Sequence, residues 1–122
     1  MAASGAAAAD PVACATTDRL DEKAICAWEA YRDEARETIR LVNKSLIYIE
    51  GYEGAETPQD VGVGRAMLVE AQEAWEVYRR ASCGLETHLY FGGDGRSLAM
   101  GTCLKRITAA RNRDLRVLLE EE

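Results

Sequence analysis

Proline, phenylalanine and histidine are scarce in this chain, and each scarcity excludes a class of structure. Two prolines and one phenylalanine in 122 residues argue against a β-sandwich with many turns. A single histidine, with no pair of cysteines in C-x-x-C spacing, argues against a structural metal site. No apolar run approaches the roughly 20 residues that a membrane-spanning helix needs. We therefore expect no metal ion and no membrane span.

The composition is that of a folded helical domain. Hydrophobic residues make up 48% of the chain, a share typical of folding sequences. Alanine, leucine, glutamate and arginine are abundant, and these residues favour helices. At 122 residues the chain suits one domain, which can bury roughly two-thirds of its unfolded surface. We expect a flexible N-terminal tail over residues 1–16 and a single helical domain over residues 17–122.

The charge balance restricts the possible partners. The chain has 21 acidic and 15 basic residues, which gives a formal net charge of −6. Nucleic acid is disfavoured because phosphate binding needs a basic face, whereas a basic protein is a compatible partner. The acidic stretch with Glu53 and Glu56 also contains tyrosines. Such a stretch would attract a basic partner and offer aromatic contacts, although a plain solvated turn has the same composition.

Three stretches have helical periodicity, with apolar residues recurring every three or four positions. The first begins near residue 17 and has stop signals at Gly51 and Gly54. The second covers about 64–82 and the third about 97–119. The pattern predicts an all-α, antiparallel bundle of three helices, with room for a fourth short one.

A glycine-rich loop at residues 84–97 is expected between the second and third helices. It contains a Gly-Gly-Asp-Gly run at 92–95 and lacks the Gly-Lys-[Ser/Thr] ending of a phosphate-binding loop. No cofactor is therefore implied. The short apolar run at 89–91, Leu-Tyr-Phe, is expected to pack this loop onto the helices.

Four cysteines, at positions 14, 26, 83 and 103, suggest two disulfides and an oxidising compartment. Four cysteines allow three pairings, and buried free thiols are a further alternative. The simplest pairing is local, because Cys83 ends the second helix and Cys103 lies early in the third. This pairing joins Cys14 to Cys26 and Cys83 to Cys103. The presence of disulfides predicts a periplasmic or secreted protein.

The order and spacing of residues over about 66–116 resemble the LprI-like lysozyme inhibitor family. The upstream cysteine pair also fits the family pattern, whereas no Ser or Thr directly follows the glycine pair. The resemblance implies an exported, all-helical, disulfide-bonded bacterial protein that inhibits lysozyme. The residues that carry it are Leu68, Ala71-Gln72-Glu73-Ala74-Trp75, Tyr78-Arg79, Cys83, Gly92-Gly93, Cys103, Thr108, Arg111 and Leu115.

A loop that blocks the glycan cleft of a lysozyme is the leading functional hypothesis. Residues 88–97 are the favoured loop, because their side chains could donate hydrogen bonds to the carboxylates of a glycosidase. A separate polar network is expected to fix the register of the helices, and it comprises Gln72, Thr108 and Arg111. The candidate partner-binding residues are His88, Tyr90, Asp94, Arg96, Ser97, Glu53 and Glu56.

The sequence also bears on two other classes of function. An enzyme is disfavoured, because His88 has no nucleophile motif and the chain has no convincing acid–base pair. The alternative is a structural or regulatory envelope protein that binds another bacterial protein through a helical face. Exposure of Trp28 or Tyr31 on the helix surface would favour this alternative.

Overall fold

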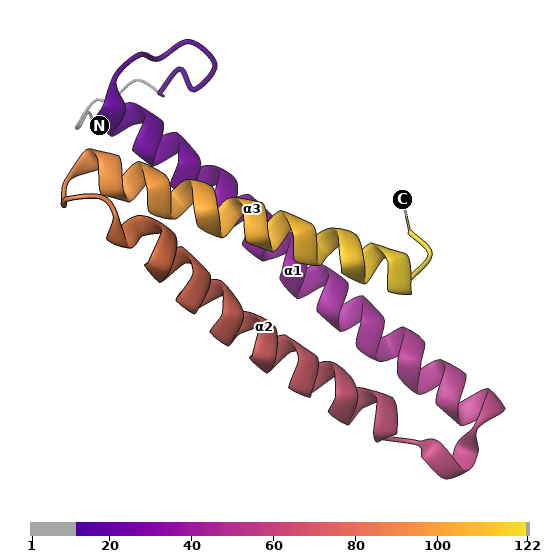
Figure 1. The fold of residues 1–122 in the computed structure, drawn as a ribbon. Coiled ribbons are helices and arrows are strands. Elements are labelled where there is room, and N and C mark those ends of the chain that lie inside the picture. Colours follow the sequence, from indigo (N-terminus) through magenta and orange to yellow (C-terminus); the bar gives the residue numbers. More distant parts are fainter. Residues whose placement is uncertain (1–11, 122) are drawn as a thin grey trace, which may run out of the picture.

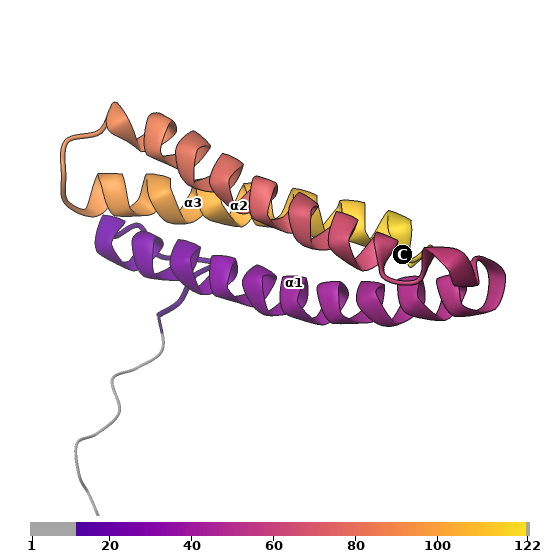
Figure 2. The same ribbon diagram turned by 90° about the horizontal axis from the view of Figure 1, so that it is seen from below.

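A computed structural model describes residues 12–121 and consists of three long helices that run up, down and up (Figure 1). Helices α1 and α3 run parallel to each other, and α2 runs antiparallel to both (Figures 1 and 2). The all-α, disulfide-bonded fold is thus confirmed. Residues 1–11 of the expected N-terminal tail lie outside the described residues. The elements are α1, Leu20–Glu56; a single 3₁₀ turn η1, Pro58–Asp60; α2, Val63–His88; and α3, Asp94–Leu118.

The two ends of this rod differ. One end, here called the tip end, holds the α2–α3 loop and the start of α1; residues 89–93 of that loop are called the tip. The other, the turn end, holds the connection from α1 to α2. Helix α1 has 37 residues and is therefore about 55 Å long. It links the two ends without interruption.

Helix α2 continues six residues beyond its predicted end and includes Gly84. Cys83 and Thr87 are completely buried, and the Thr87 hydroxyl donates to the Cys83 carbonyl at 2.7 Å. This packing holds the helical conformation, while a glycine inside a helix costs only about 1 kcal/mol. Helix α3 also begins three residues earlier than predicted, so the loop shrinks to residues 89–93.

Small and polar residues bring α1 and α3 close together. A Cβ atom added to Gly101 would lie 2.9 Å from Trp28 Cδ1 and 3.1 Å from the Trp28 backbone nitrogen. Further along, the Thr38 hydroxyl donates to Asn112 Oδ1 at 2.6 Å, and Asn112 Nδ2 donates to the Glu34 carbonyl at 2.9 Å. Both Asn112 groups are thus satisfied although the residue is completely buried. Helices α1 and α3 contact each other more extensively than either contacts α2.

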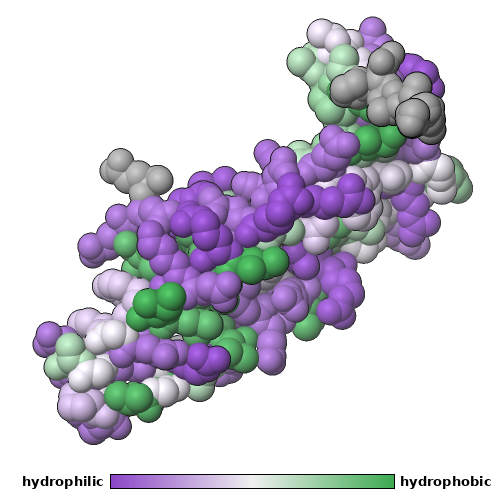
Figure 3. Space-filling view, turned by 180° about the vertical axis from the view of Figure 1, so that it is seen from behind, coloured by the Kyte–Doolittle hydropathy of each residue, from purple (hydrophilic) through white to green (hydrophobic). Residues whose placement is uncertain are grey.

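Helix α2 contributes less to the core. Its buried residues are Leu68, Cys83 and Thr87, and only Leu68 joins the apolar cluster of Leu41 and Leu115. Polar contacts and a disulfide hold the rest of α2 against α3. The outer surface of the rod is correspondingly mixed, with hydrophobic patches among hydrophilic residues along the face in Figure 3.

The two disulfides join the cysteines by the predicted local pairing. Cys14 is bonded to Cys26, with Cα atoms 5.7 Å apart, and Cys83 is bonded to Cys103, with Cα atoms 5.6 Å apart. The first fastens the segment before α1 to that helix, and the second joins α2 to α3. Of the described helices, none is both long and apolar enough to span a bilayer.

Candidate partner-binding site

The tip carries apolar side chains that face solvent. Phe91 is 96% exposed, Leu89 is 83% exposed and Tyr90 is about half exposed. The prediction that these residues pack the loop onto the helices is therefore wrong. The tip reaches beyond the first turn of α1, so no helix of the described chain lies over it (Figure 2). Exposed apolar residues gathered on a protruding loop are typical of a contact surface.

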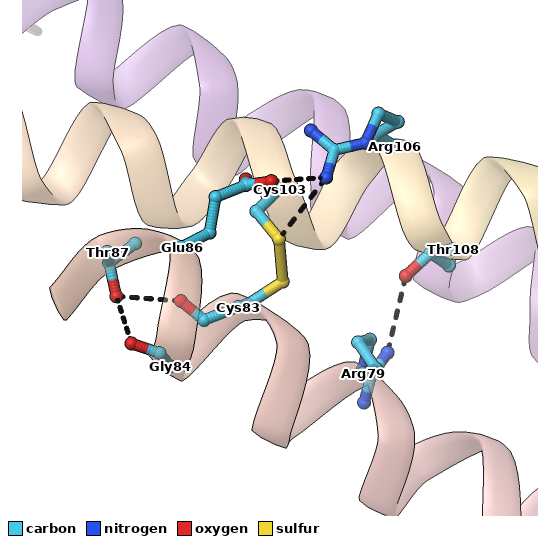
Figure 4. Close-up of a disulfide and its surroundings, with 8 residues drawn as sticks. All are labelled: Arg79, Cys83, Gly84, Glu86, Thr87, Cys103, Arg106 and Thr108. Carbon is cyan, nitrogen blue, oxygen red and sulfur yellow. Dashed lines mark hydrogen bonds and ion pairs between the residues drawn. A yellow bond between two sulfur atoms is a disulfide. The ribbon is translucent and has the colours of Figure 1, made fainter. Parts of the chain in front are cut away.

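Covalent and ionic links hold the base of the tip (Figure 4). The Cys83–Cys103 disulfide is completely buried and joins α2 to α3 close to the loop. On the surface beside it, Arg106 Nη2 donates to Glu86 Oε1 at 2.7 Å. The same nitrogen lies 3.7 Å from Cys103 Sγ. These links fix the spacing of the two helices from which the tip emerges.

Ser97 ties the first turn of α3 to α1. Trp28 Nε1 donates to the Ser97 carbonyl at 3.0 Å and lies 3.2 Å from Ser97 Oγ. Ser97 is half-buried. Ser97 therefore positions the start of α3 beneath the tip and is not a freely exposed contact residue.

The other predicted residues of this loop lie around the tip. His88 is the last residue of α2, Asp94 is the first of α3, and Arg96 follows in the same turn. All three are exposed. The ion pairs at this end join Arg106 to Glu86 and Arg19 to Asp21, and no described residue forms one with Arg96. Arg96 therefore presents an exposed guanidinium beside the apolar tip, two positions from the exposed carboxylate of Asp94.

Glu53 and Glu56 lie at the turn end, far from the tip. Glu53 is only 7% exposed and accepts hydrogen bonds from the Gly62 and Gly64 nitrogens at 3.2 and 2.8 Å. Because Gly62 has no side chain to cap α2, the Glu53 carboxylate supplies the acceptor for the start of that helix. The structure thus corrects the prediction for Glu53, which caps α2 and is not available to a partner.

The distance between the two ends separates Glu56 from the tip residues. Ser97 lies against Trp28, and Glu56 follows 28 residues later on the same helix. At 1.5 Å per residue, that interval is about 42 Å. Glu56 remains exposed. It can act on a partner at the tip only through the long-range electrostatic field.

The predicted polar residues between α2 and α3 form two separate contacts. Arg111 Nε donates to Gln72 Oε1 at 2.6 Å, while Thr108 accepts from Arg79 Nη1 at 3.3 Å. Partial burial lowers the pKa of Arg111, and Asp114 opposes that effect. These two contacts, with the disulfide, align the antiparallel helices.

Arg79 was not among the candidate site residues, although its side chain contacts residues of all three helices. Its guanidinium carbon lies 4.5 Å from the ring centroid of Trp75 on α2 and 5.6 Å from that of Tyr31 on α1. It also contacts Thr108 on α3. The spacing of four residues from Trp75 is the signal that could have found it, because such residues share a helix face.

The fold and the site define a disulfide-bonded, all-helical protein that presents an apolar tip at one end. Within the described residues, no cluster of three or more potential ligands could hold a metal ion. The family model described as lysozyme inhibitor LprI matches residues 13–115, and the chain belongs to this family. The match includes both disulfides and the tip, and it extends the resemblance to the first helix. No curated protein and no solved structure matches the chain.

Proposed function

We propose that this protein is an exported inhibitor whose tip, with the flanking residues from 88 to 97, enters the glycan cleft of a lysozyme. The observation that carries the proposal is the 96% exposure of Phe91 on a loop clamped by a disulfide. Family membership supports a lysozyme as the partner. The disulfides suit the periplasm or the cell exterior, where such bonds persist.

The apolar tip supplies the binding energy in this proposal. Full burial of a leucine or phenylalanine side chain stabilises a complex by about 1.5–3 kcal/mol. Leu89 and Phe91 are both exposed before binding, so nearly all of that area is available to a partner. The disulfide at the base reduces the conformational entropy that the loop would lose on binding.

Arg96 supplies the polar contact. A lysozyme cleft holds a pair of carboxyl groups on either side of the scissile bond. The Arg96 guanidinium is exposed and can donate two parallel hydrogen bonds to one carboxylate. His88 and Tyr90 border the same surface and offer further donors, while Asp94 favours contact with basic residues at the rim of the cleft.

The overall charge acts at longer range. A net charge of −6 attracts a basic lysozyme and speeds its association at low ionic strength. This effect needs no direct contact, so Glu56 contributes to it despite its distance from the tip. Trp28 and Tyr31 are half-buried, so the exposure that would have favoured the helical-face alternative is not present.

Inhibition of cell-wall lysis tests the proposal. The oxidised protein is titrated against a panel of animal and bacteriophage lysozymes. Phe91→Ser should weaken inhibition of the sensitive lysozyme at least about tenfold, as expected for an aromatic anchor. Ile47→Ser is the matched control, because Ile47 is 75% exposed on α1 away from the tip. Failure of the wild-type protein to inhibit any lysozyme, or equal inhibition by both variants, would contradict the proposal.

Arg96 is tested in the same assay by the neutral variant Arg96→Gln. Loss of one charge-assisted contact should weaken inhibition about tenfold. Arg113→Gln removes the same charge from an exposed position further along α3 and is the control. Equal effects of the two variants would contradict a direct contact of Arg96 with the cleft and would show that it acts only through the overall charge.

A further inference from the structure

Helix α2 carries an exposed stripe of apolar and aromatic side chains that leads to the tip. Tyr78 is 60% exposed, Leu85 is 74% exposed, and Ala81 between them is also exposed. Because they are three and four positions apart, these residues lie on one face of the helix. Leu89 follows four positions after Leu85 and keeps helical backbone angles. The outer stripe, defined here as Tyr78, Ala81 and Leu85, therefore continues directly into the tip.

The charged residues next to the outer stripe in sequence point elsewhere. Glu86 and Arg79 point toward α3, where each contacts a side chain of that helix (Figure 4). Arg80 follows Tyr78 by two positions, which turns it by about 200° around the helix axis. The outer stripe thus presents a surface without charge in a helix that is otherwise rich in charged residues.

The loop that is proposed to enter a lysozyme cleft is small for a protein–protein interface. Residues 88–97 are ten in number. In an interface of standard size, each partner contributes about 20–30 residues and buries about 800 Å². A stable complex therefore needs further contact surface beside the tip.

Of the surfaces that border the tip, the outer stripe shares its apolar character. Helix α3 begins with the charged residues Asp94 and Arg96, both exposed. At the start of α1, Leu20 is exposed but lies between Arg19 and Asp21, which form an ion pair. Contact through either of these two helix starts would require the removal of water from charged groups, which the outer stripe does not require.

We propose that the outer stripe is a second contact surface for the lysozyme and lies against the rim of the cleft when the tip is inside it. This inference rests on the proposed function, because it takes the tip as the part that enters the cleft. At 1.5 Å per residue, Leu85 lies about 6 Å behind Leu89 along the helix axis, and Tyr78 lies about 17 Å behind it. Met67, on the same helix, is about 33 Å behind Leu89. The contribution to binding should therefore decrease from Leu85 to Tyr78 and be absent at Met67.

Titration calorimetry with an inhibited lysozyme tests this surface. Leu85→Ser should raise the dissociation constant about tenfold, and Tyr78→Ser should raise it about threefold. Met67→Ser is the matched control, because Met67 is 65% exposed on the same helix, and it should change the constant less than about twofold. Leu85→Ser should also make the heat-capacity change of binding less negative, because less apolar surface is buried in the complex. Circular dichroism checks that all three variants retain their helices.

Comparison with Phe91→Ser separates this inference from the proposed function. If Leu85→Ser binds as tightly as Met67→Ser while Phe91→Ser binds more weakly, the inference is overturned and the proposal for the tip stands. If Leu85→Ser binds more weakly and Phe91→Ser does not, the outer stripe is a lysozyme contact and the proposal for the tip fails. A wild-type protein that binds no lysozyme contradicts both.

Discussion

Helices α1 and α3 are held together differently from helix α2. Helices α1 and α3 approach closely, because Gly101 lies against Trp28 and the buried side chains of Thr38 and Asn112 form a hydrogen bond between the two helices. Helix α2 has few buried residues and is fastened at points: by Glu53 at its start and by the disulfide of Cys83 near its end. We call the α1–α3 pair the frame and α2 the arm. The arm carries one side of the tip.

This arrangement means that stability and tip position depend on different residues. A change in the frame should unfold the whole protein, because both sides of that interface are buried. A change in a fastening of the arm should displace the tip while the frame persists. The variants below distinguish these two effects, from the largest expected loss to the smallest.

The variant Asn112→Asp should be the most destabilising. It places a carboxylate at a completely buried position and faces it toward the Glu34 carbonyl, which now accepts from Asn112 Nδ2. An uncompensated buried charge costs about 3–5 kcal/mol. Urea denaturation at neutral pH measures the loss. Asn43→Asp makes the same change at an exposed position of α1 and should cost less than about 0.5 kcal/mol.

Removal of the α2–α3 disulfide should release the arm. The double variant Cys83→Ala/Cys103→Ala opens a loop of 20 residues, and the chain-entropy treatment gives a loss of about 3 kcal/mol. Hydrogen exchange should increase at the end of α2 while the α1–α3 frame stays protected, and lysozyme inhibition should weaken.

The other disulfide is the matched control for this experiment. Cys14→Ala/Cys26→Ala opens a loop of 12 residues, so its entropic cost is similar. Because it does not join α2 to α3, inhibition should be retained. If both double variants lost inhibition equally, the special role of the α2–α3 link at the tip would be refuted.

Alanine substitutions at two glycines test the difference in packing between the frame and the arm. Gly101→Ala forces a Cβ against Trp28 and should destabilise the protein by about 1–3 kcal/mol. Gly84→Ala adds a Cβ with nothing within 4 Å inside α2, so higher helix propensity should stabilise the protein by up to about 1 kcal/mol. Thermal unfolding measures both. Similar melting temperatures for the two variants would contradict the packing difference.

The smallest effect concerns pH. Hydrogen bonds from Lys44 and Arg40 lower the pKa of Glu121 from its ordinary value of 4.5 to about 2. A carboxylate with a lowered pKa stabilises the fold above its unfolded pKa, and that contribution is lost as pH falls from about 5 to 2. The melting temperature of Glu121→Gln should therefore depend less on pH over this window than that of the wild-type protein. Parallel curves would show that the contact does not persist in solution.

The helices and the disulfide pairing could be predicted because they depend on local information. Apolar periodicity located the three helices, and cysteines at the adjoining ends of two helices pointed to a local bond. Helix ends were less predictable. Gly84 is a typical stop signal, yet the burial of Cys83 and Thr87 carries the helix past it.

The exposure of the site residues could not be predicted from the sequence. It depends on which helices pack over each residue, and this is set by the tertiary fold. In sequence, Leu89 and Phe91 resemble anchors of a loop, and only the reach of the tip beyond α1 leaves them exposed. Glu53 resembles its acidic neighbours, and only the fold brings the Gly62 and Gly64 nitrogens to its carboxylate.

Competition with an oligosaccharide tests the central claim most directly. A lysozyme that the protein inhibits is titrated with it in the presence of increasing amounts of an N-acetylglucosamine oligomer that occupies the glycan cleft. If the tip enters the cleft, the apparent dissociation constant of the protein should rise linearly with the oligomer concentration, from its value without oligomer. Simultaneous binding of the oligomer and the protein, with an unchanged dissociation constant, would contradict the account.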